Sequence, residues 1–217
     1  ARQRAGRAGR LSEGVCYRLW SRAAEHRMAS MREPEILTAD LAPMVLDITA
    51  WGESDPSRLP WITPPPPGHI AHAQTLLKSL GALDDDGRIT TAGRRLAALP
   101  CHPRIARMLD SASTPQLRAL GCDIAALLEE KDPLNDEADA DITTRIALLR
   151  QYRRSRCTGR WQRIADIASQ YRRLIECEAD NASFDPCAAG RLVALAYPER
   201  VAMATTDGRY RLASGEY

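Results

Sequence analysis

Four arginines in the first ten residues, ARQRAGRAGR, are the part of this chain whose residue types and spacing most directly suggest chemistry. An arginine side chain stays protonated and presents a fork of N–H donors, which suits it to binding phosphate groups. Arg7 and Arg10 are three residues apart, so both can lie on one face of a helical turn and converge on one anion. Gly6 and Gly9 remove side-chain bulk where another backbone must come close. On its own, the segment is also compatible with an exposed basic turn.

Basic side chains are concentrated in two parts of the chain. Only Lys78 and Lys131 are lysines, which leaves 28 arginines among the 30 basic residues. Residues 1–32 carry eight arginines against two acids, and residues 145–173 carry nine against one. A general preference for arginine accounts for most of the excess, and both stretches are candidates for solvated faces or for phosphate-facing surfaces. The acidic stretch 129–141 is interpreted as a solvated loop.

The elements nearest the arginine-rich start are short. The alternating pattern of residues 14–20, GVCYRLW, predicts a strand, and residues 21–31 follow as a link or a short helix. Thr38 is a candidate N-cap for a helix that ends at Gly52. The predicted apolar face of that helix comprises Leu41, Met44, Val45, Ile48 and Trp51.

The next segment has the order of a winged helix. Residues 53–69 contain six prolines and are predicted to form an extended connector. A helix over 70–83 with Gly81 near its end is followed by a strand–turn–strand around Asp86–Gly87. Another helix then ends at Pro100. Together with the preceding helix, this order of helix, hairpin and helix predicts a winged helix.

Beyond this point the apolar residues recur at helical spacing, so the fold class is mainly α. Either Ser113 or Thr114 caps the second of these helices, which has Pro115 at its start. A hairpin around Asp207–Gly208 closes the sequence and is interpreted as the beginning of a β-module. The predicted helices cover residues 103–112, 115–130, 141–155, 160–177 and 186–200.

The segment QRAGRAGR (3–10) matches the pattern QRxGRxGR and resembles motif VI of the DEAH-box family of ATP-dependent helicases. The resemblance continues through GVCYRLW, EPEILTADLAPMVLDITAWG, LPWITPPP, LLKSLGALDDDGRITTAGRRLAALPCHPRIARML, LGCDIAALLEEKDPL and RLVALAYPERVA, which look like the bacterial HrpB-type branch. It covers nearly the whole chain in the family's order. Eight residues can match by chance, whereas an ordered series of segments does not.

The resemblance implies four parts. Residues 1–32 would complete the second RecA-like α/β domain and 33–100 would form the winged helix. Residues 101–200 would form a helical, ratchet-like domain, and 201–217 would begin a C-terminal β-module. The implied function is that of a portion of an ATP-dependent RNA helicase, a hydrolase acting on ATP.

The resemblance also implies a site. Arg7 and Arg10 would be arginine fingers that neutralise charge on the γ-phosphate of ATP. Gln3 would contact the γ-phosphate or the attacking water, and Arg4 would brace the motif locally. The implied cofactor is ATP with Mg²⁺, and the implied partner is RNA, with DNA left open.

Two other helicase motifs are missing. The sequence contains no Gly-Lys pair and therefore no phosphate-cradling loop of the type GxxxxGK[ST]. The letters DEAD at 136–139 follow motif VI within an acidic polar stretch rather than a buried strand, so we reject them as a magnesium site. With neither a P-loop nor a DExH motif, the chain alone is expected to be an inactive fragment whose nucleotide-cradling half lies upstream of Ala1.

The arginine-rich stretch 145–173 supplies candidates for a nucleic-acid backbone, although no family motif fixes which residues make contact. Tyr152, Trp161 and Tyr171 interleave with these arginines, but their helical spacing favours a place in the core over base stacking. The candidate contacts are Arg150, Arg153, Arg154, Arg156, Arg160 and Arg163.

The histidine and cysteine residues give little support for a metal site or a nucleophilic active site. His69 and His72 are three residues apart without a nearby cysteine or carboxylate, and are interpreted as helix-surface residues; His102 is expected to pack at a turn. The six cysteines form no CxxC pair, which favours reduced thiols and a cytoplasmic location. No apolar run approaches the roughly 20 residues of a membrane span, so no membrane partner is expected.

Two other functions are compatible with the residues alone. One is a stand-alone winged-helix protein that binds nucleic acid without catalysis and uses QRAGRAGR as a phosphate-touching arm. The other is an interaction scaffold in which the winged helix docks a protein.

Overall fold

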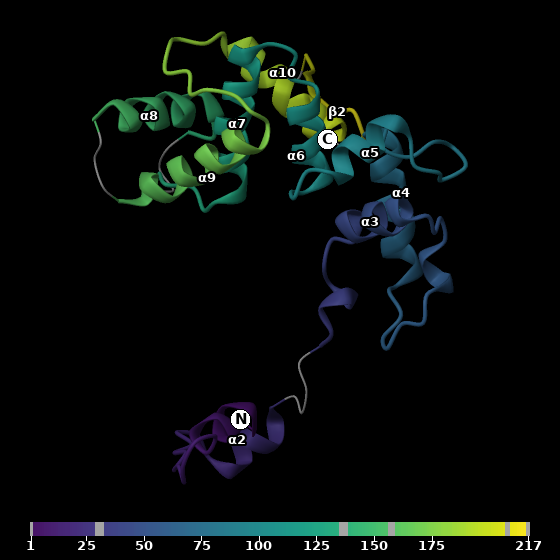
Figure 1. Ribbon diagram of the computed structural model, residues 1–217, viewed down its shortest axis with the longest axis vertical. Helices are drawn as coiled ribbons and strands as arrows, with labels where there is room; N and C mark the ends of the chain where they lie inside the picture. Colours follow the sequence, from purple (N-terminus) through teal and green to yellow (C-terminus); the bar gives the residue numbers. More distant parts are fainter. Residues whose placement is uncertain (1, 29–32, 135–138, 156–158, 207–208, 216–217) are drawn as a thin grey trace. The chain divides into compact units, whose positions relative to one another are not determined.

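The computed structural model describes residues 2–28, 33–134, 139–155, 159–206 and 209–215, with the side chains of residues 2–4 left out. It is mainly helical, as predicted, and divides into two units, Ala1–Thr38 and Ala39–Tyr217 (Figure 1). None of the described helices combines the length and the hydrophobicity that crossing a bilayer requires.

The first unit holds short helices. Ser21 caps the second of them, because its hydroxyl oxygen accepts a hydrogen bond of 3.2 Å from the Ala24 N–H. Gly14 lies against the end of the first helix, where an added Cβ atom would be 2.1 Å from the Ala8 carbonyl oxygen. The chain can therefore pass this point only with glycine. The helices are α1 (Arg2–Ala8), α2 (Arg22–Arg27) and the 3₁₀ helix η1 (Glu35–Leu37).

The prediction of a strand over 14–20 is wrong. Val15, Tyr17 and Leu19 alternate as a strand would require, but they are 75%, 83% and 93% exposed. Within the described part of the chain, no backbone group forms a ladder with this segment. A strand exists only through hydrogen bonds to a neighbour, so the pattern alone could not produce one.

The second unit begins with three helices, of which the second and third pack on the first. The first of them starts after Asp40, whose carboxylate oxygen Oδ1 accepts a 2.8 Å hydrogen bond from the Ala42 N–H. The prediction that Thr38 caps this helix is wrong, because Thr38 instead follows the last residue of η1. The three helices are α3 (Ala42–Trp51), α4 (Pro67–Ser79) and α5 (Thr91–Ala97).

The predicted apolar face of α3 is largely confirmed. Leu41, Val45 and Ile48 are buried, and Met44 is half-buried. Trp51 is the exception, since it is 80% exposed. It is the last helical residue, directly before Gly52, where a φ of 115° ends the helix.

The connector between α3 and α4 is irregular, as predicted, apart from a single 3₁₀ turn η2 (Pro56–Arg58). The indole N–H of Trp61 donates a 2.7 Å hydrogen bond to the Pro56 carbonyl, which folds the connector on itself. Proline lacks a backbone donor and resists helix interiors, so a proline-rich stretch stays outside the regular elements.

The wing is reduced to a tight turn. One antiparallel bridge joins Leu83 and Ile89, and Gly87 adopts a φ of 78° in the turn between them. The predicted strand–turn–strand is therefore present only as a single bridge. Thr90 closes the turn: its N–H donates to the Ala82 carbonyl at 2.9 Å, and its hydroxyl accepts from the Gly93 N–H at 2.9 Å to cap α5.

Five further helices follow in the second unit. Thr114, one of the two candidate caps, accepts a 3.2 Å hydrogen bond from the Leu117 N–H. All five helices were predicted from the spacing of apolar residues, with ends that differ by a few residues. They are α6 (Pro103–Asp110), α7 (Pro115–Glu129), α8 (Ile142–Ser155), α9 (Arg160–Leu174) and α10 (Pro186–Ala196), followed by the 3₁₀ turn η3 (Pro198–Arg200).

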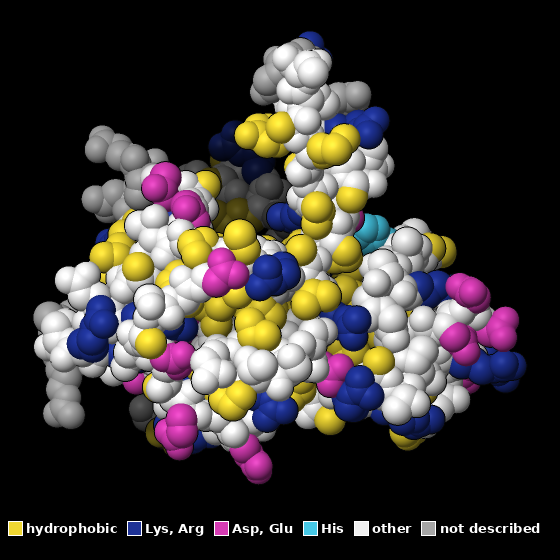
Figure 2. Space-filling view, turned by 90° about the horizontal axis from the view of Figure 1, so that it is seen from above, with side chains coloured by type: hydrophobic (Ala, Val, Ile, Leu, Met, Phe, Trp, Pro, Cys, Tyr) yellow, Lys and Arg dark blue, Asp and Glu magenta, His cyan; other side chains and the backbone are white. Residues whose placement is uncertain are grey.

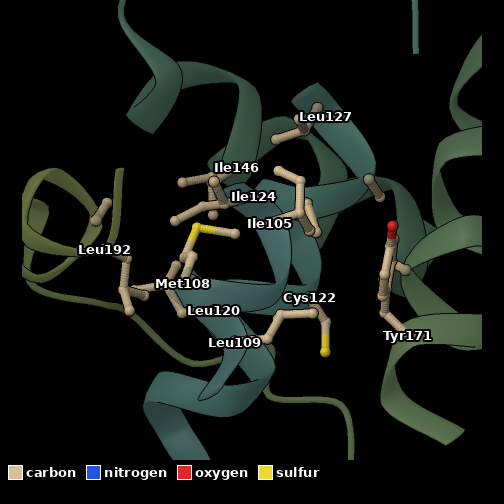
Figure 3. Close-up of a cluster of buried hydrophobic side chains, with 14 of the residues drawn as sticks. Ile105, Met108, Leu109, Leu120, Cys122, Ile124, Leu127, Ile146, Tyr171 and Leu192 are labelled. Carbon is tan, nitrogen blue, oxygen red and sulfur yellow. The ribbon is translucent and has the colours of Figure 1, made fainter. Parts of the chain in front are cut away.

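The core of these helices is centred on α7, which is buried almost continuously from Ala119 to Leu127. Figure 3 shows side chains from α6, α8, α9 and α10 arranged around it, with the Met108 sulfur directed toward Ile124 and Ile146. A helix that is apolar on nearly all sides must be surrounded by others, which explains why α7 is the central one.

The predicted C-terminal hairpin is confirmed. Strands β1 (Ala202–Ala204) and β2 (Tyr210–Leu212) pair antiparallel, with Met203 opposite Arg211. The predicted turn residues Asp207–Gly208 lie outside the described residues. Met203 and Tyr210 are exposed, so this hairpin has no core of its own among the residues described.

We expect Gly93→Ala to destabilise the second unit by about 1–3 kcal/mol, the usual cost of overpacking. A Cβ atom at this position would be 2.1 Å from the Ala82 carbonyl oxygen and 2.8 Å from the Ile89 Cγ1. Gly68→Ala is the matched control, because a Cβ atom there meets nothing within 4 Å. Urea unfolding followed by circular dichroism compares the two, and equal midpoints would contradict the prediction.

Candidate functional site

The arginine motif QRAGRAGR lies at the start of the first unit. Gln3 and Arg4 belong to α1, although their side chains are outside the described residues. Arg7 is near the end of α1, and Arg10 lies two residues beyond it. The expectation that Arg7 and Arg10 share one face of a helical turn is therefore not met, because the helix stops before Gly9, a residue with low helix propensity.

The guanidinium groups of Arg7 and Arg10 are exposed. In the part of the chain that the structure describes, neither forms an ion pair or a hydrogen bond. Elsewhere in the same unit Arg18 does have a partner, since its Nη1 donates to the Glu25 carboxylate at 2.5 Å. Arg7 and Arg10 are thus free to bind an external anion.

The glycines of the motif are not required by packing within the described residues. A Cβ atom added at Gly6 or Gly9 would meet no described atom within 4 Å. The predicted close approach at these two positions would have to come from another molecule or segment. The motif therefore offers donors suited to a phosphate group, and the sequence offers no loop that would cradle the rest of a nucleotide.

The second candidate region, 145–173, is organised around one buried acid. Asp123 of α7 is fully buried, and its two carboxylate oxygens face arginines from α8 and α9. Arg150 Nε donates to Asp123 Oδ2 at 3.2 Å, and Arg153 donates to both oxygens. Arg172 Nη1 is 3.5 Å from Asp123 Oδ1. We call these four residues the Asp123 cluster.

A backbone carbonyl and an amide side chain accept further hydrogen bonds from the arginines of the Asp123 cluster. Arg150 donates to the Ala182 carbonyl at 2.5 Å, and Arg153 donates to the Asn181 side chain at 2.8 Å. Burial lowers the pKa of Arg172, and the neighbouring charge of Arg153 acts in the same direction. The prediction that Arg150 and Arg153 contact a nucleic-acid backbone is therefore wrong, because both side chains are committed to the interior.

The other predicted contacts remain closer to the surface. Arg160 is exposed at the start of α9 and has no partner among the residues described. Arg154 donates to the Asn181 carbonyl at 3.3 Å, and Arg163 pairs with Glu130 at 2.7 Å. Arg156 lies outside the described residues. On the face shown in Figure 2, basic and acidic side chains are interspersed, so this face is not a continuous basic surface.

The aromatic residues of this stretch belong to the core, as predicted. Tyr152 and Tyr171 are buried, and Trp161 is half-buried against the hydrophobic core that contains Tyr171. Each buried hydroxyl has a partner: Tyr152 donates to Gln162 at 2.5 Å, and Tyr171 donates to the Glu129 carboxylate. These rings are therefore not platforms for base stacking.

Metal ligation has no basis in the described residues, which contain no group of three or more His, Cys, Asp or Glu side chains able to share an ion. His69 and His72 are exposed on α4. His102 caps α6 by accepting from the Arg104 N–H at 3.2 Å, and its Nε2 is 3.1 Å from Asp40. Of the DEAD letters, 136–138 lie outside the described residues, whereas Asp139 is exposed.

The roles of Asp123 and Arg172 were not among the predictions from the sequence. A signal was present: Asp123 is the single acid in the apolar run LGCDIAALL, and a charge in such a place requires a partner. The partner's identity depends on how α7, α8 and α9 pack, which the spacing does not specify.

Comparison with known proteins identifies a domain family first and similar whole proteins second. Residues 73–101, which hold most of α4, the wing and α5, match the helicase associated domain (HA2), winged-helix family. This chain is 36% identical over 214 residues to the ATP-dependent RNA helicase HrpB of Escherichia coli, covering 98% of this chain and 24% of that protein. It is 40% identical over 119 residues to the HrpA homologue of Haemophilus influenzae, covering 52% and 9%.

Solved structures agree with the sequence relatives. Two crystal structures of Escherichia coli HrpB match 99% of this chain, with TM-scores of 0.68 and 0.70 at 34% and 35% identity. The helicase-associated family match covers the winged helix, and helices α6–α10 follow it as a bundle. The chain belongs to the DEAH-box helicase family, in its HrpB-type branch, and spans about a quarter of the length of the HrpB proteins it matches.

We expect Asp123→Asn to destabilise the second unit by about 3–5 kcal/mol, because it leaves three buried guanidinium groups without a countercharge. Asp47→Asn on the exposed face of α3 is the control and should change stability by less than about 0.5 kcal/mol. Thermal and urea unfolding measure both. A destabilisation no larger than that of the control would show that the Asp123 cluster does not hold the helices together.

Proposed function

We propose that this chain forms the part of an ATP-dependent RNA helicase that senses the γ-phosphate of ATP and grips the nucleic-acid strand. The observation that carries the proposal is the exposure of Arg7 and Arg10, free of partners among the described residues, within a motif of the type QRxGRxGR. A relative named as an RNA helicase matches 98% of the chain, which favours the helicase over a free-standing winged-helix protein.

We propose the same four-part division that the sequence suggests. Residues 1–32 complete a RecA-like domain, 33–100 form the winged helix, 101–200 the ratchet-like helical domain, and 201–217 the start of a β-module. The exposed apolar side chains of Val15, Tyr17 and Leu19 support the first assignment, since they need the cover that a larger domain provides. The family match over 73–101 supports the second.

In this proposal Arg7 and Arg10 donate hydrogen bonds to the γ-phosphate oxygens. Their positive charges oppose the negative charge that builds there as the terminal phosphoryl group is transferred to water. Gln3 orients the attacking water or contacts the same phosphate. ATP with Mg²⁺ supplies the reacting bond when bound, and the P-loop that holds it belongs to polypeptide beyond this sequence.

Nucleic acid is the second proposed ligand, with RNA favoured by the names of the relatives. Arg160, which is exposed at the start of α9, is the best-placed of the predicted backbone contacts, followed by Arg154. Arg150 and Arg153 act indirectly, by keeping α8 and α9 in place. The cytoplasmic location expected from the cysteine pattern is part of this proposal.

We expect Arg10→Ala to reduce ATP hydrolysis by the complete helicase about 10³-fold or more, the usual contribution of an arginine finger. The fold should persist, because Arg10 contacts no described side chain through an ion pair or hydrogen bond. Arg27→Ala, an exposed arginine of α2 in the same unit, is the control and should leave turnover unchanged. Wild-type turnover in Arg10→Ala would remove this residue from the site.

We expect Arg160→Ala to weaken binding of single-stranded RNA and to reduce the slope of log K against log salt by about 0.7, the loss of one phosphate contact. Arg191→Ala is the control, since that arginine is exposed on α10 but already paired with Asp185 at 3.3 Å. Fluorescence anisotropy over a salt series gives both slopes. Equal slopes for the two variants would exclude Arg160 from the interface, and the same series with DNA decides between the two substrates.

A further inference from the structure

Two cysteines that the proposed function does not use face each other inside the second unit. Cys122 of α7 is fully buried, and Cys177 is half-buried three residues after the end of α9. Their sulfur atoms are 3.9 Å apart, although 55 positions separate them in the sequence. Among the described residues, no other two cysteine sulfur atoms lie within hydrogen-bonding distance of each other.

The backbone after α9 holds Cys177 in place. The Cys177 N–H donates a 2.9 Å hydrogen bond to the Arg172 carbonyl, which folds the chain back over the helix end. Glu176, directly before it, has a φ of 51°, in the left-handed region that non-glycine residues rarely occupy. The turn that brings Cys177 to α7 is therefore a specific conformation rather than a continuation of the helix.

Positive charge lies beside the two thiols. The Asp123 cluster places three guanidinium groups around one carboxylate, so positive charge is in excess. Arg172 Nη1 is buried and has no hydrogen-bond partner among the described residues. Arg172 also interacts electrostatically with both Cys122 and Cys177. A thiolate next to this side chain would supply the missing negative charge.

The two thiols differ in their access to reagents. Burial raises the pKa of Cys122, and the charge of Arg172 opposes this effect only in part. Cys177 is the more accessible of the two. Any reagent from solution should therefore meet Cys177 first, with Cys122 positioned behind it as the second thiol.

We propose that Cys122 and Cys177 are a peroxide-reactive pair that closes to a reversible intramolecular disulfide. The Cys177 thiolate attacks one oxygen of hydrogen peroxide, the O–O bond breaks, and a sulfenic acid and hydroxide form. The hydroxide takes up the proton that Cys177 released. The sulfur of Cys122 then attacks the Cys177 sulfur, the S–O bond breaks, and the Cys122 proton leaves with the departing hydroxyl as water. Two thiols and one peroxide thus give one disulfide and two waters.

The two sulfur atoms are near enough for the bond to form with a small movement. A disulfide has an S–S distance of about 2 Å, so the sulfur atoms must approach by about 2 Å. The bond would join α7 directly to the segment after α9. The non-covalent contact between Cys122 and Cys177 would thus become a covalent link next to Asp123. This inference stands independently of the proposed function.

The test treats the protein with hydrogen peroxide, alkylates the remaining thiols and maps tryptic peptides without reduction. Cys122 falls in the peptide 119–131, and Cys177 falls in 174–191 together with Cys187. Cys187→Ser, at an exposed position of α10, is therefore the parent protein for every measurement. Cys157 falls in a separate peptide and can be distinguished directly.

We expect the linked peptides 119–131 and 174–191 to be about tenfold more abundant than any other cross-linked pair, because the two sulfurs are already adjacent. Dithiothreitol should restore both thiols. Cys122→Ala should leave Cys177 as a sulfenic acid that dimedone captures, and Cys177→Ala should leave Cys122 unmodified. Oxidation of the parent should raise the thermal midpoint by about 5 °C or more, a readout that does not depend on either variant folding.

Several results would overturn the proposal. One is a parent protein in which Cys177 ends as a sulfenic or sulfinic acid while Cys122 stays a free thiol. Another is a dominant link between Cys122 and any cysteine other than Cys177, or links between molecules. A third is the absence of reaction at Cys177 under conditions that oxidise the exposed Cys16.

Discussion

The carboxylate of Asp123 is the point on which the second unit depends. It is fully buried in α7, and the arginines that neutralise it come from α8 and α9, so it ties three helices together at one place. Removing a charged group from water is costly unless several partners replace its hydration. Here Arg150 and Arg153 donate hydrogen bonds to the carboxylate, and Arg172 adds a third positive charge 3.5 Å away. Much of the arginine excess in residues 145–173 therefore serves the architecture, and only the remainder is available for ligands.

The same use of arginine recurs where the winged helix meets the helices behind it. Arg95 of α5 donates two hydrogen bonds, of 2.7 and 2.9 Å, to the Asp110 carboxylate of α6. Within the helices that follow, Arg104 of α6 likewise donates to Glu199 at 3.0 Å and lies 4.8 Å from the ring centre of Tyr197. Planar, bidentate contacts fix orientation as well as distance. The winged helix and the bundle consequently form one compact unit rather than two independent modules.

The sequence was informative wherever local chemistry decides the structure. Helical spacing located α7 and α9, Thr114 and Pro115 marked a helix start, and glycine at 52 and 81 marked helix ends. The sequence was misleading wherever the structure of a segment depends on a partner far away in the chain. The strand over 14–20 requires a neighbour, and Arg150 and Arg153 could be assigned to the surface or the interior only once Asp123 was seen between them. For Arg7 and Arg10, both the sequence and the structure indicate exposed hydrogen-bond donors. The anion that these donors would bind is not part of the chain.

The exposed apolar side chains of Val15, Tyr17 and Leu19 have a practical consequence for handling the polypeptide. A row of uncovered large side chains beside unpaired backbone is a template for aggregation. A protein cut between Thr38 and Ala39 would separate these side chains from the second unit, Ala39–Tyr217. The remainder should then stay dispersed at the concentrations needed for crystals or spectroscopy, whereas the short piece by itself should precipitate.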